Sequence, residues 1–422
     1  MADDPAVAEA VALAHRKEWA FVLAATARVT RDLDLAEECV QDAYAKALTA
    51  WSETGIPARP GAWLTTTARN RAIDLIRREA SFRAALPLLA DDEVASGPAD
   101  GEDIADERLR LIFTCCHPAL APEAQVALTL GLVCGLTTAE IARAFLVTES
   151  TMAARITRAK KKIAVARIPY RIPDAENLSE RIGTVLTVVD LLFTTGHVAP
   201  NGPDLMNTEL ISRALDLARM LTELLPSDPE VTALLALMLL TDARRAARLD
   251  STGTPVLLAD QDRGRWDQAA IREGQALVRR ALRRGPAGQF AVRAAIAAVH
   301  SESPTWEATD WTEIVGLYDV LLARRPSPVA ALNRAVAKGF AAGPEAGLAA
   351  LEELATEPQL ATYPYAAVAR GEFLRRLGRE REARSAYEEA LTFTENAAER
   401  ETLRQRLAEL GDEPGQSAGT DR

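Results

Sequence analysis

Five basic side chains lie within eight residues of a 422-residue chain whose net charge is −11. They are Arg155, Arg158, Lys160, Lys161 and Lys162. Ammonium and guanidinium groups neutralise backbone phosphates, and guanidinium groups also donate hydrogen bonds to base edges. Residues 140–171 hold eight cations and two acids, whereas residues 80–107 hold one cation and eight acids. Because the charges are segregated, this basic segment predicts nucleic-acid binding in spite of the acidic total.

Two amphipathic segments, separated by a turn at residues 146–148, must position these cations. In the first, Thr137 and Glu140 have the spacing of a capping box. The inner face of this segment is Ile141, Ala142 and Phe145, and that of the second is Met152, Ile156, Ala159 and Ile163. This spacing is typical of a helix-turn-helix, whose second helix enters a major groove. The side chains expected to face bases and nearby phosphates are Glu149, Ser150, Thr151, Ala154, Arg155 and Arg158, followed by Lys160, Lys161 and Lys162 at backbone phosphates. The alternative is a solvated basic face on an ordinary helical hairpin.

The segment "GLTTAEIARAF…STMAARITRAKKKI" resembles region 4 of the extracytoplasmic-function (group IV) sigma factors of bacterial RNA polymerase, the region that reads the −35 element. Upstream, "DLAEECVQDAYAKALTAW" resembles sigma region 2.2, which docks on the largest polymerase subunit. The next segment, "GAWLTTTARNRAIDLIRRE", resembles regions 2.3 to 2.4, which melt the −10 element. The two blocks occur in the family's order.

The resemblance implies roles for particular side chains. The implied polymerase-docking face is Glu37, Glu38, Gln41 and Asp42. The implied −10 melting and recognition residues are Trp63, Arg69, Asn70, Arg71, Asp74 and Arg77. Two simpler interpretations stay open: Trp51 and Trp63 are core residues, or Asp74 forms an ion pair with Arg77 or Arg78 at helical spacing.

The composition favours an all-α fold, because strong helix formers dominate and few segments alternate with period two. We expect a sigma region 2 helical bundle at 1–80, a flexible acidic linker at 81–106 and a region 4 helix-turn-helix at 107–170. A C-terminal TPR-like helical domain follows at 171–411, with a disordered tail at 412–422.

The C-terminal half has a weak internal repeat. In "LRRLGREREARSAYEEAL", small residues fall at the offsets of a TPR helix pair, and Gly343 precedes Gly378 by 35 residues. Stretches such as "ARIPYRIP" and "QDRGRWD" resemble the sigma subgroup with a fused TPR-like domain, although "LLFTTGH" at 191–197 departs from its usual "LLFNEGY". We expect this domain to regulate the sigma half, by inhibition or by activation, and to bind a protein or peptide ligand. Deleting residues 181–422 would test both hypotheses, inhibition and activation of the sigma half.

The remaining reactive side chains do not form a convincing catalytic or metal site. Cys115 and Cys116 are adjacent and have no second cysteine pair, so inward packing is the better interpretation. His15, His197 and His300 are scattered, and "WDQAAIREG" and "DWTEIVGLYD" have the spacing of helix surfaces or repeat packing. The sequence has no Gly-rich phosphate loop, and no cofactor is expected. The N-terminus lacks signal-peptide features and no apolar run is long enough to span a membrane, which favours a cytoplasmic protein.

We therefore predict an alternative sigma factor rather than an enzyme. Its expected partners are core RNA polymerase, double-stranded promoter DNA and the melted −10 strand. One rival is a helix-turn-helix activator with a TPR-like interaction domain and no sigma activity, for which substitution of Asn70 or Asp74 should be silent. Another is an enzyme that uses Cys115 or Cys116, for which a Cys-to-Ser change should abolish activity.

Overall fold

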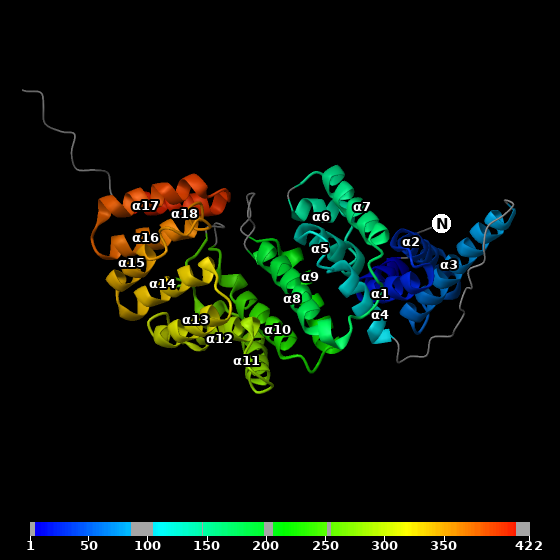
Figure 1. The fold of residues 1–422 in the computed structure, drawn as a ribbon, viewed down its shortest axis with the longest axis horizontal. Coiled ribbons are helices and arrows are strands. Elements are labelled where there is room, and N and C mark those ends of the chain that lie inside the picture. Colours follow the sequence, from blue (N-terminus) through cyan, green and yellow to red (C-terminus); the bar gives the residue numbers. More distant parts are fainter. Residues whose placement is uncertain (1–4, 86–103, 146, 198–205, 251–254, 411–422) are drawn as a thin grey trace, which may run out of the picture. The chain divides into compact units, whose positions relative to one another are not determined.

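The computed structural model describes residues 5–85, 104–145, 147–197, 206–250 and 255–410 (Figure 1). Within these ranges the regular structure is helical, and the β-type pairing is an isolated bridge between Leu249 and Pro255. The all-α expectation is confirmed. The chain divides into two compact units, Met1–Leu192 and Phe193–Arg422, which are described separately.

The first unit opens with three long helices, α1 (Pro5–Thr30), α2 (Leu33–Thr54) and α3 (Pro60–Ala85), which pack on one another. Asp32 caps α2 by accepting hydrogen bonds from the amides of Asp34 and Leu35 at 2.8 and 3.0 Å. Gly55 ends α2 with a φ of 85°, a conformation that costs glycine little. The core of this bundle includes Leu23, Trp51 and Leu64, all at most 1% exposed.

The expected linker is shorter than residues 81–106 at both ends. Helix α3 continues to Ala85, and α4 (Ile104–Cys115) begins before residue 107. Ala80, Arg83, Ala84 and Ala85 favour helix, so α3 has no reason to end at residue 80. The acidic stretch 86–103 and the expected tail from residue 412 lie outside the described residues.

The rest of the first unit consists of shorter helices. They are α4, α5 (Pro122–Leu128), a π-helical turn (Thr129–Val133), α6 (Thr138–Ala144), α7 (Glu149–Val165) and the first part of α8 (Ala175–His197). Gly135 follows the π-turn and has a φ of 71°. A Cβ added to Gly135 would lie 3.0 Å from the rings of His15 and Trp19, so the backbone approaches these rings closely. Arg181 of α8 donates to the carbonyl of Phe113 at 2.6 Å, which fastens the start of α8 to α4.

The second unit continues with helices joined by short connections. They are α9 (Thr208–Leu224), α10 (Pro229–Asp242), α11 (Gln268–Leu282), α12 (Gln289–Glu302), α13 (Trp311–Arg324), α14 (Pro328–Ala342), α15 (Pro344–Glu352), α16 (Pro364–Arg376), α17 (Glu380–Phe393) and α18 (Ala397–Glu409). Successive helices pack as pairs, as TPR-like repeats do. Residues 231–240 of α10 are buried all round, so α10 is the central helix of its part of the stack.

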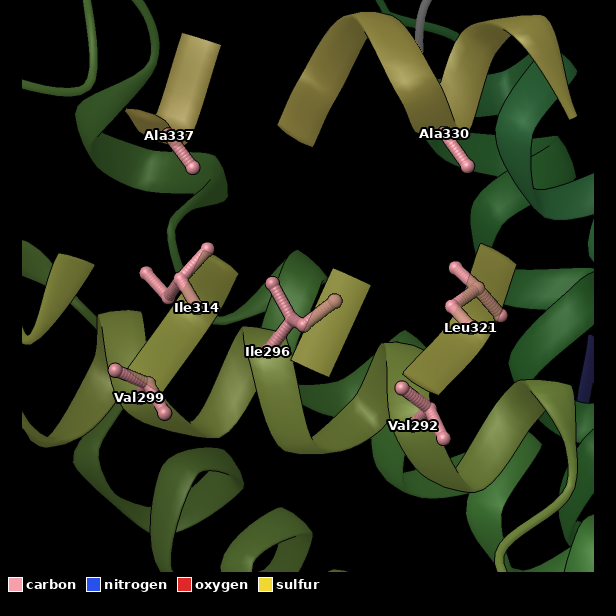
Figure 2. Packing of buried hydrophobic residues seen from close by; sticks show 7 residues of the cluster. All are labelled: Val292, Ile296, Val299, Ile314, Leu321, Ala330 and Ala337. Carbon is pink, nitrogen blue, oxygen red and sulfur yellow. The ribbon is translucent and has the colours of Figure 1, made fainter. Parts of the chain in front are cut away.

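Figure 2 shows how three of these helices share a core. The branched side chains of α12 and α13 face one another, and α14 contributes only methyl groups at this layer. The labelled residues are Val292, Ile296, Val299, Ile314, Leu321, Ala330 and Ala337. Because alanine takes little space, α14 can approach α13 closely.

Two crossings farther along the second unit depend on glycine. A Cβ on Gly339 would lie 2.1 Å from the ring of Phe373, and one on Gly371 would lie 2.7 Å from Tyr387. Phe373 and Tyr387 are each 1% exposed, so neither ring has room to move. These contacts let α14 approach α16, and α16 approach α17.

Candidate nucleic-acid interface

The capping box expected at the start of the first amphipathic helix is present. The amide of Thr137 donates to Glu140 Oε2 at 2.7 Å, and the amide of Glu140 donates to Thr137 Oγ1 at 3.2 Å. Thr148 caps α7 in the same manner, accepting from the amide of Thr151 at 3.2 Å. Both helices therefore begin where the sequence places them.

Loss of the first cap has a measurable cost. Thr137→Ala should lower the local opening free energy of α6 by about 1 kcal/mol, because the Glu140 amide loses its acceptor. Amide hydrogen exchange in peptides covering α6 should then be about fivefold faster. Thr66→Ala is the matched control, since Thr66 Oγ1 bonds only within α3, to Ala62 O at 2.9 Å. Unchanged exchange in α6 of Thr137→Ala would mean that the cap does not hold this helix.

Apart from Lys160, the residues of α7 have the burial and exposure that their helical spacing predicts. Met152, Ala159 and Ile163 are buried and Ile156 is half-buried. On the outer face, the exposed residues are Glu149, Ser150, Thr151, Ala154, Arg158, Lys161 and Lys162, with Arg155 half-buried. This face presents cations and small polar groups together, which suits contacts to phosphates and base edges.

Lys160 departs from the pattern of its neighbours. Its ammonium group binds Asp34 Oδ1 at 2.7 Å and Glu37 Oε2 at 2.5 Å, both on α2, and its side chain is only 13% exposed. Burial opposes the charge on Lys160, but the hydrogen bonds to Asp34 and Glu37 outweigh it and raise its pKa above the ordinary value. We call Lys160, Asp34 and Glu37 the Lys160 latch. In this conformation Lys160 is not available to a DNA phosphate.

The latch lies beside a groove of about 490 Å³ within the first unit. Glu37 and Gln41 line it from α2, and Ile156 and Lys160 line it from α7. Helix α1 is bonded to the same part of the unit: Trp19 Nε1 donates to Leu132 O at 3.2 Å and Tyr170 donates to Ala24 O at 3.0 Å. The ion pairs of Lys160 therefore join a predicted DNA-binding helix to the predicted polymerase-docking helix.

The residues implied for docking and melting also meet each other. Glu38, Gln41 and Asp42 are exposed on α2, and Asp42 accepts a hydrogen bond from Arg71 of α3 at 2.8 Å. On α3, Asn70, Asp74 and Arg77 are exposed, whereas Trp63 and Arg69 are half-buried. The polar side chains of α3 thus lie next to the exposed polar face of α2, which they meet at Asp42.

The two tryptophans that were ambiguous in the sequence have different positions. Trp51 is 1% exposed and belongs to the core. The ring of Trp63 packs edge-on against it, with ring centroids 5.6 Å apart, and keeps part of its surface in solvent. Trp63 is therefore a core neighbour that keeps part of its ring exposed.

Cys115 and Cys116 are fully buried, as inward packing predicts. Burial raises the pKa of both thiols, that of Cys116 to about 11, although Thr129 forms a hydrogen bond with Cys116. A thiol with such a pKa is not a thiolate nucleophile at neutral pH. In the described part of the chain, no group of three His, Cys, Asp or Glu side chains is placed to hold a metal ion.

Comparison with known proteins identifies the first unit. Residues 17–82 match the Sigma-70 region 2 family and residues 110–163 match the Sigma-70 region 4 family. The ECF RNA polymerase sigma factor SigK of Mycobacterium ulcerans (strain Agy99) is 31% identical over 156 residues, 35% of this chain and 80% of the relative. The chain belongs to the ECF family of RNA polymerase sigma factors. As an ECF sigma factor it binds core RNA polymerase and promoter DNA and directs transcription initiation.

The comparisons also cover the C-terminal half of the sigma factor. Residues 181–282 match a family of unknown function (DUF6596). An uncharacterized protein of Rhizobium meliloti (strain 1021) is 44% identical over 399 residues, 93% of this chain and 94% of that protein. The helical extension is thus shared along its length with that relative. None of the described helices is long and apolar enough to cross a membrane.

Sequence reasoning missed two features of this site. It did not include Asp34, although Asp34 lies one helical turn before Glu37 and therefore shares its face. It also treated Lys160, Lys161 and Lys162 alike, because helical spacing alone did not show which lysine faces another part of the protein.

Proposed function

We propose that α7 of this sigma factor reads the −35 element and that α3 recognises and melts the −10 element. Exposure of Arg158, Lys161 and Lys162 on α7 and of Asn70, Asp74 and Arg77 on α3 supports these roles. The partly exposed ring of Trp63 supports a role in stacking on an unpaired base. The exposed acids of α2 suit docking on a basic polymerase surface. Its site of action is the cytoplasm, where RNA polymerase meets promoters.

We further propose that the described conformation is a closed state of the sigma half. The observation that carries this is the Lys160 latch. The −10 and −35 elements lie about 25 base pairs apart, or about 85 Å along B-DNA. Because α3, the proposed −10 helix, packs against α2, an α7 held to α2 cannot reach the −35 element at the same time, so α7 must leave α2 before promoter binding. Opening also frees Glu37 from its ion pair with Lys160, so that its carboxylate is available to the polymerase beside the exposed Gln41.

The TPR-like extension regulates this equilibrium in our proposal. Its covalent fusion to the DNA-reading unit keeps it at high effective concentration, which suits a built-in regulator. Stacked helix pairs form surfaces that accept a peptide or a helix from a partner protein. Whether the extension favours the closed or the open state is to be read from its effect on transcription.

Run-off transcription with purified core polymerase, the full chain and a promoter library tests the residue roles. Arg158→Ala should lower promoter-specific transcripts about fivefold, corresponding to a lost contact of ~1 kcal/mol, and Asn70→Ala should impair open-complex formation. Arg16→Ala, an exposed residue of α1 outside the proposed surfaces, is the control. If Asn70→Ala is silent and the chain only raises output from another sigma factor's holoenzyme, the activator interpretation is correct instead.

A further inference from the structure

The second unit contains a cavity of about 380 Å³ bordered by α10, α12, α13 and α14. One wall is aromatic: Trp311 lies 4.6 Å from both Trp306 and Phe340, measured between ring centroids. Trp306 also meets Phe340 edge-on at 4.9 Å. Pockets for small organic molecules typically start at about 300 Å³, so this space suits a body of one or two rings.

The polar wall of the cavity is positively charged. It is formed by Arg244, Arg293, His300, Asn333 and Tyr318, and no carboxylate of the described residues lines it. Burial and the nearby Arg248 and Arg263 lower the pKa of Arg244 to about 10, so Arg244 is still charged at neutral pH. Burial and the same arginine cluster lower the pKa of His300 to about 4, so His300 is neutral there.

The three arginines of this cluster, Arg244, Arg248 and Arg263, differ in how far nearby groups balance their charge. Asp242 and Glu399 act on Arg248, and Glu307 acts on Arg263. Arg263 also donates to His300 O at 2.7 Å and to Ser303 O at 2.5 Å. The side chain of Arg244 makes no hydrogen bond or ion pair with any described residue, and the charges that act on it are those of Arg248 and Arg263. A buried, unpaired cation is costly to a folded protein, and a bound anion would remove that cost.

We propose that this cavity binds a small organic anion with a flat apolar body. Its carboxylate pairs with Arg244, and its ring lies against Trp306, Trp311 and Phe340. A guanidinium group binds a carboxylate through two parallel hydrogen bonds, which gives the site both affinity and orientation. The cavity is too small for an extended peptide, which separates this site from the concave surface proposed for a protein partner.

Calorimetric titration of the full chain with a defined panel tests the proposal. The probes are benzoate, 4-hydroxybenzoate, phenylpyruvate and indole-3-acetate, with benzamide and indole-3-acetamide as neutral counterparts. We expect at least one carboxylate to bind with a sub-millimolar Kd and its amide at least tenfold more weakly. Arg244→Met should weaken binding about tenfold or more, whereas Arg272→Met, an exposed arginine of α11, should not change it.

Thermal unfolding without ligand separates a binding role from a structural one. Because Arg244→Met removes an unpaired buried cation, it should leave the Tm of the second unit unchanged or raise it. Arg244→Lys keeps the positive charge but loses the two parallel hydrogen-bond donors of the guanidinium group. This variant should bind the carboxylate with intermediate affinity. The proposal is wrong if no carboxylate binds below 5 mM, if Arg244→Met binds equally well, or if Arg244→Met lowers the Tm. Binding of a tryptophan-terminated tripeptide alone would also overturn it, in favour of a peptide site.

Discussion

Lys160→Met should tighten the apparent affinity of the free sigma factor for core polymerase about tenfold. Glu37 is released from Lys160 only in the open state, so the apparent affinity for polymerase scales with the fraction of molecules that are open. Hydrogen bonds to charged groups contribute about 1.5–3 kcal/mol each. The Lys160–Asp34 pair contributes less than this, because Asp34 is exposed to solvent. A net loss of about 1.4 kcal/mol corresponds to the tenfold change. Fluorescence anisotropy with labelled polymerase would measure it.

The neighbouring lysine provides a matched control. Lys161→Met removes the same charge one residue away on α7, but Lys161 is exposed and outside the latch. It should leave polymerase affinity unchanged while both variants reduce the salt dependence of promoter binding by about one phosphate contact. Hydrogen exchange in α7 should rise only in Lys160→Met. Equal polymerase affinity in the two variants would rule out the closed state as a barrier to docking.

The latch should not respond to physiological pH through its lysine. The pKa of Lys160 is raised above 10.5, so its contribution to the closed state is fully present below that value. That contribution is lost only as pH rises through the raised pKa of the closed state. The tenfold difference between Lys160→Met and the parent protein should therefore persist from pH 7 to pH 9.

Gly339→Val should destabilise the second unit by about 2–3 kcal/mol, since the new side chain would overlap the Phe373 ring. Valine favours helix over glycine by only about half a kcal/mol, which does not offset the overlap. For a unit of this size we expect the Tm to fall by roughly 5–10 °C in differential scanning calorimetry. Exchange measurements should place the loss in α14, α15 and α16.

Gly316→Val is the corresponding control within the same unit. Gly316 lies in α13, and nothing lies within 4 Å of the position that its Cβ would take. This variant should be as stable as the parent or slightly more so, because the helix gains a better helix former. If both valine variants unfold alike, close approach of α14 and α16 is not what requires glycine at position 339.

Local signals made most of the first unit predictable. The capping pair Thr137 and Glu140, the apolar spacing of α7 and the turn before Thr148 each depend on residues within one or two turns. Local signals did not predict that Lys160 pairs with α2 while Lys161 and Lys162 stay exposed. Lys160 binds Asp34 across a separation of 126 residues, and that contact depends on how two helical groups pack.

The cavity of the second unit was missed for a related reason. "DWTEIVGLYD" has the spacing of an ordinary repeat helix, and Trp311 and Tyr318 do pack in the stack. They also line the cavity, because residues from α10, α12 and α14 meet them there. His300 lacked a partner along the sequence, but the fold places it beside Arg244 and Arg263. No spacing rule connects positions so far apart.

Helix α8 determines where the chain can be cut. A fragment that stops at residue 180 would lose Arg181 and with it the hydrogen bond to Phe113, next to the buried Cys115 and Cys116. It would also remove Val185, Leu186 and Val189, which are at most 2% exposed and belong to the first unit. Weak transcription by such a fragment would report a damaged sigma half rather than an activating extension. A deletion that keeps α8 whole to His197 asks the regulatory question without that damage.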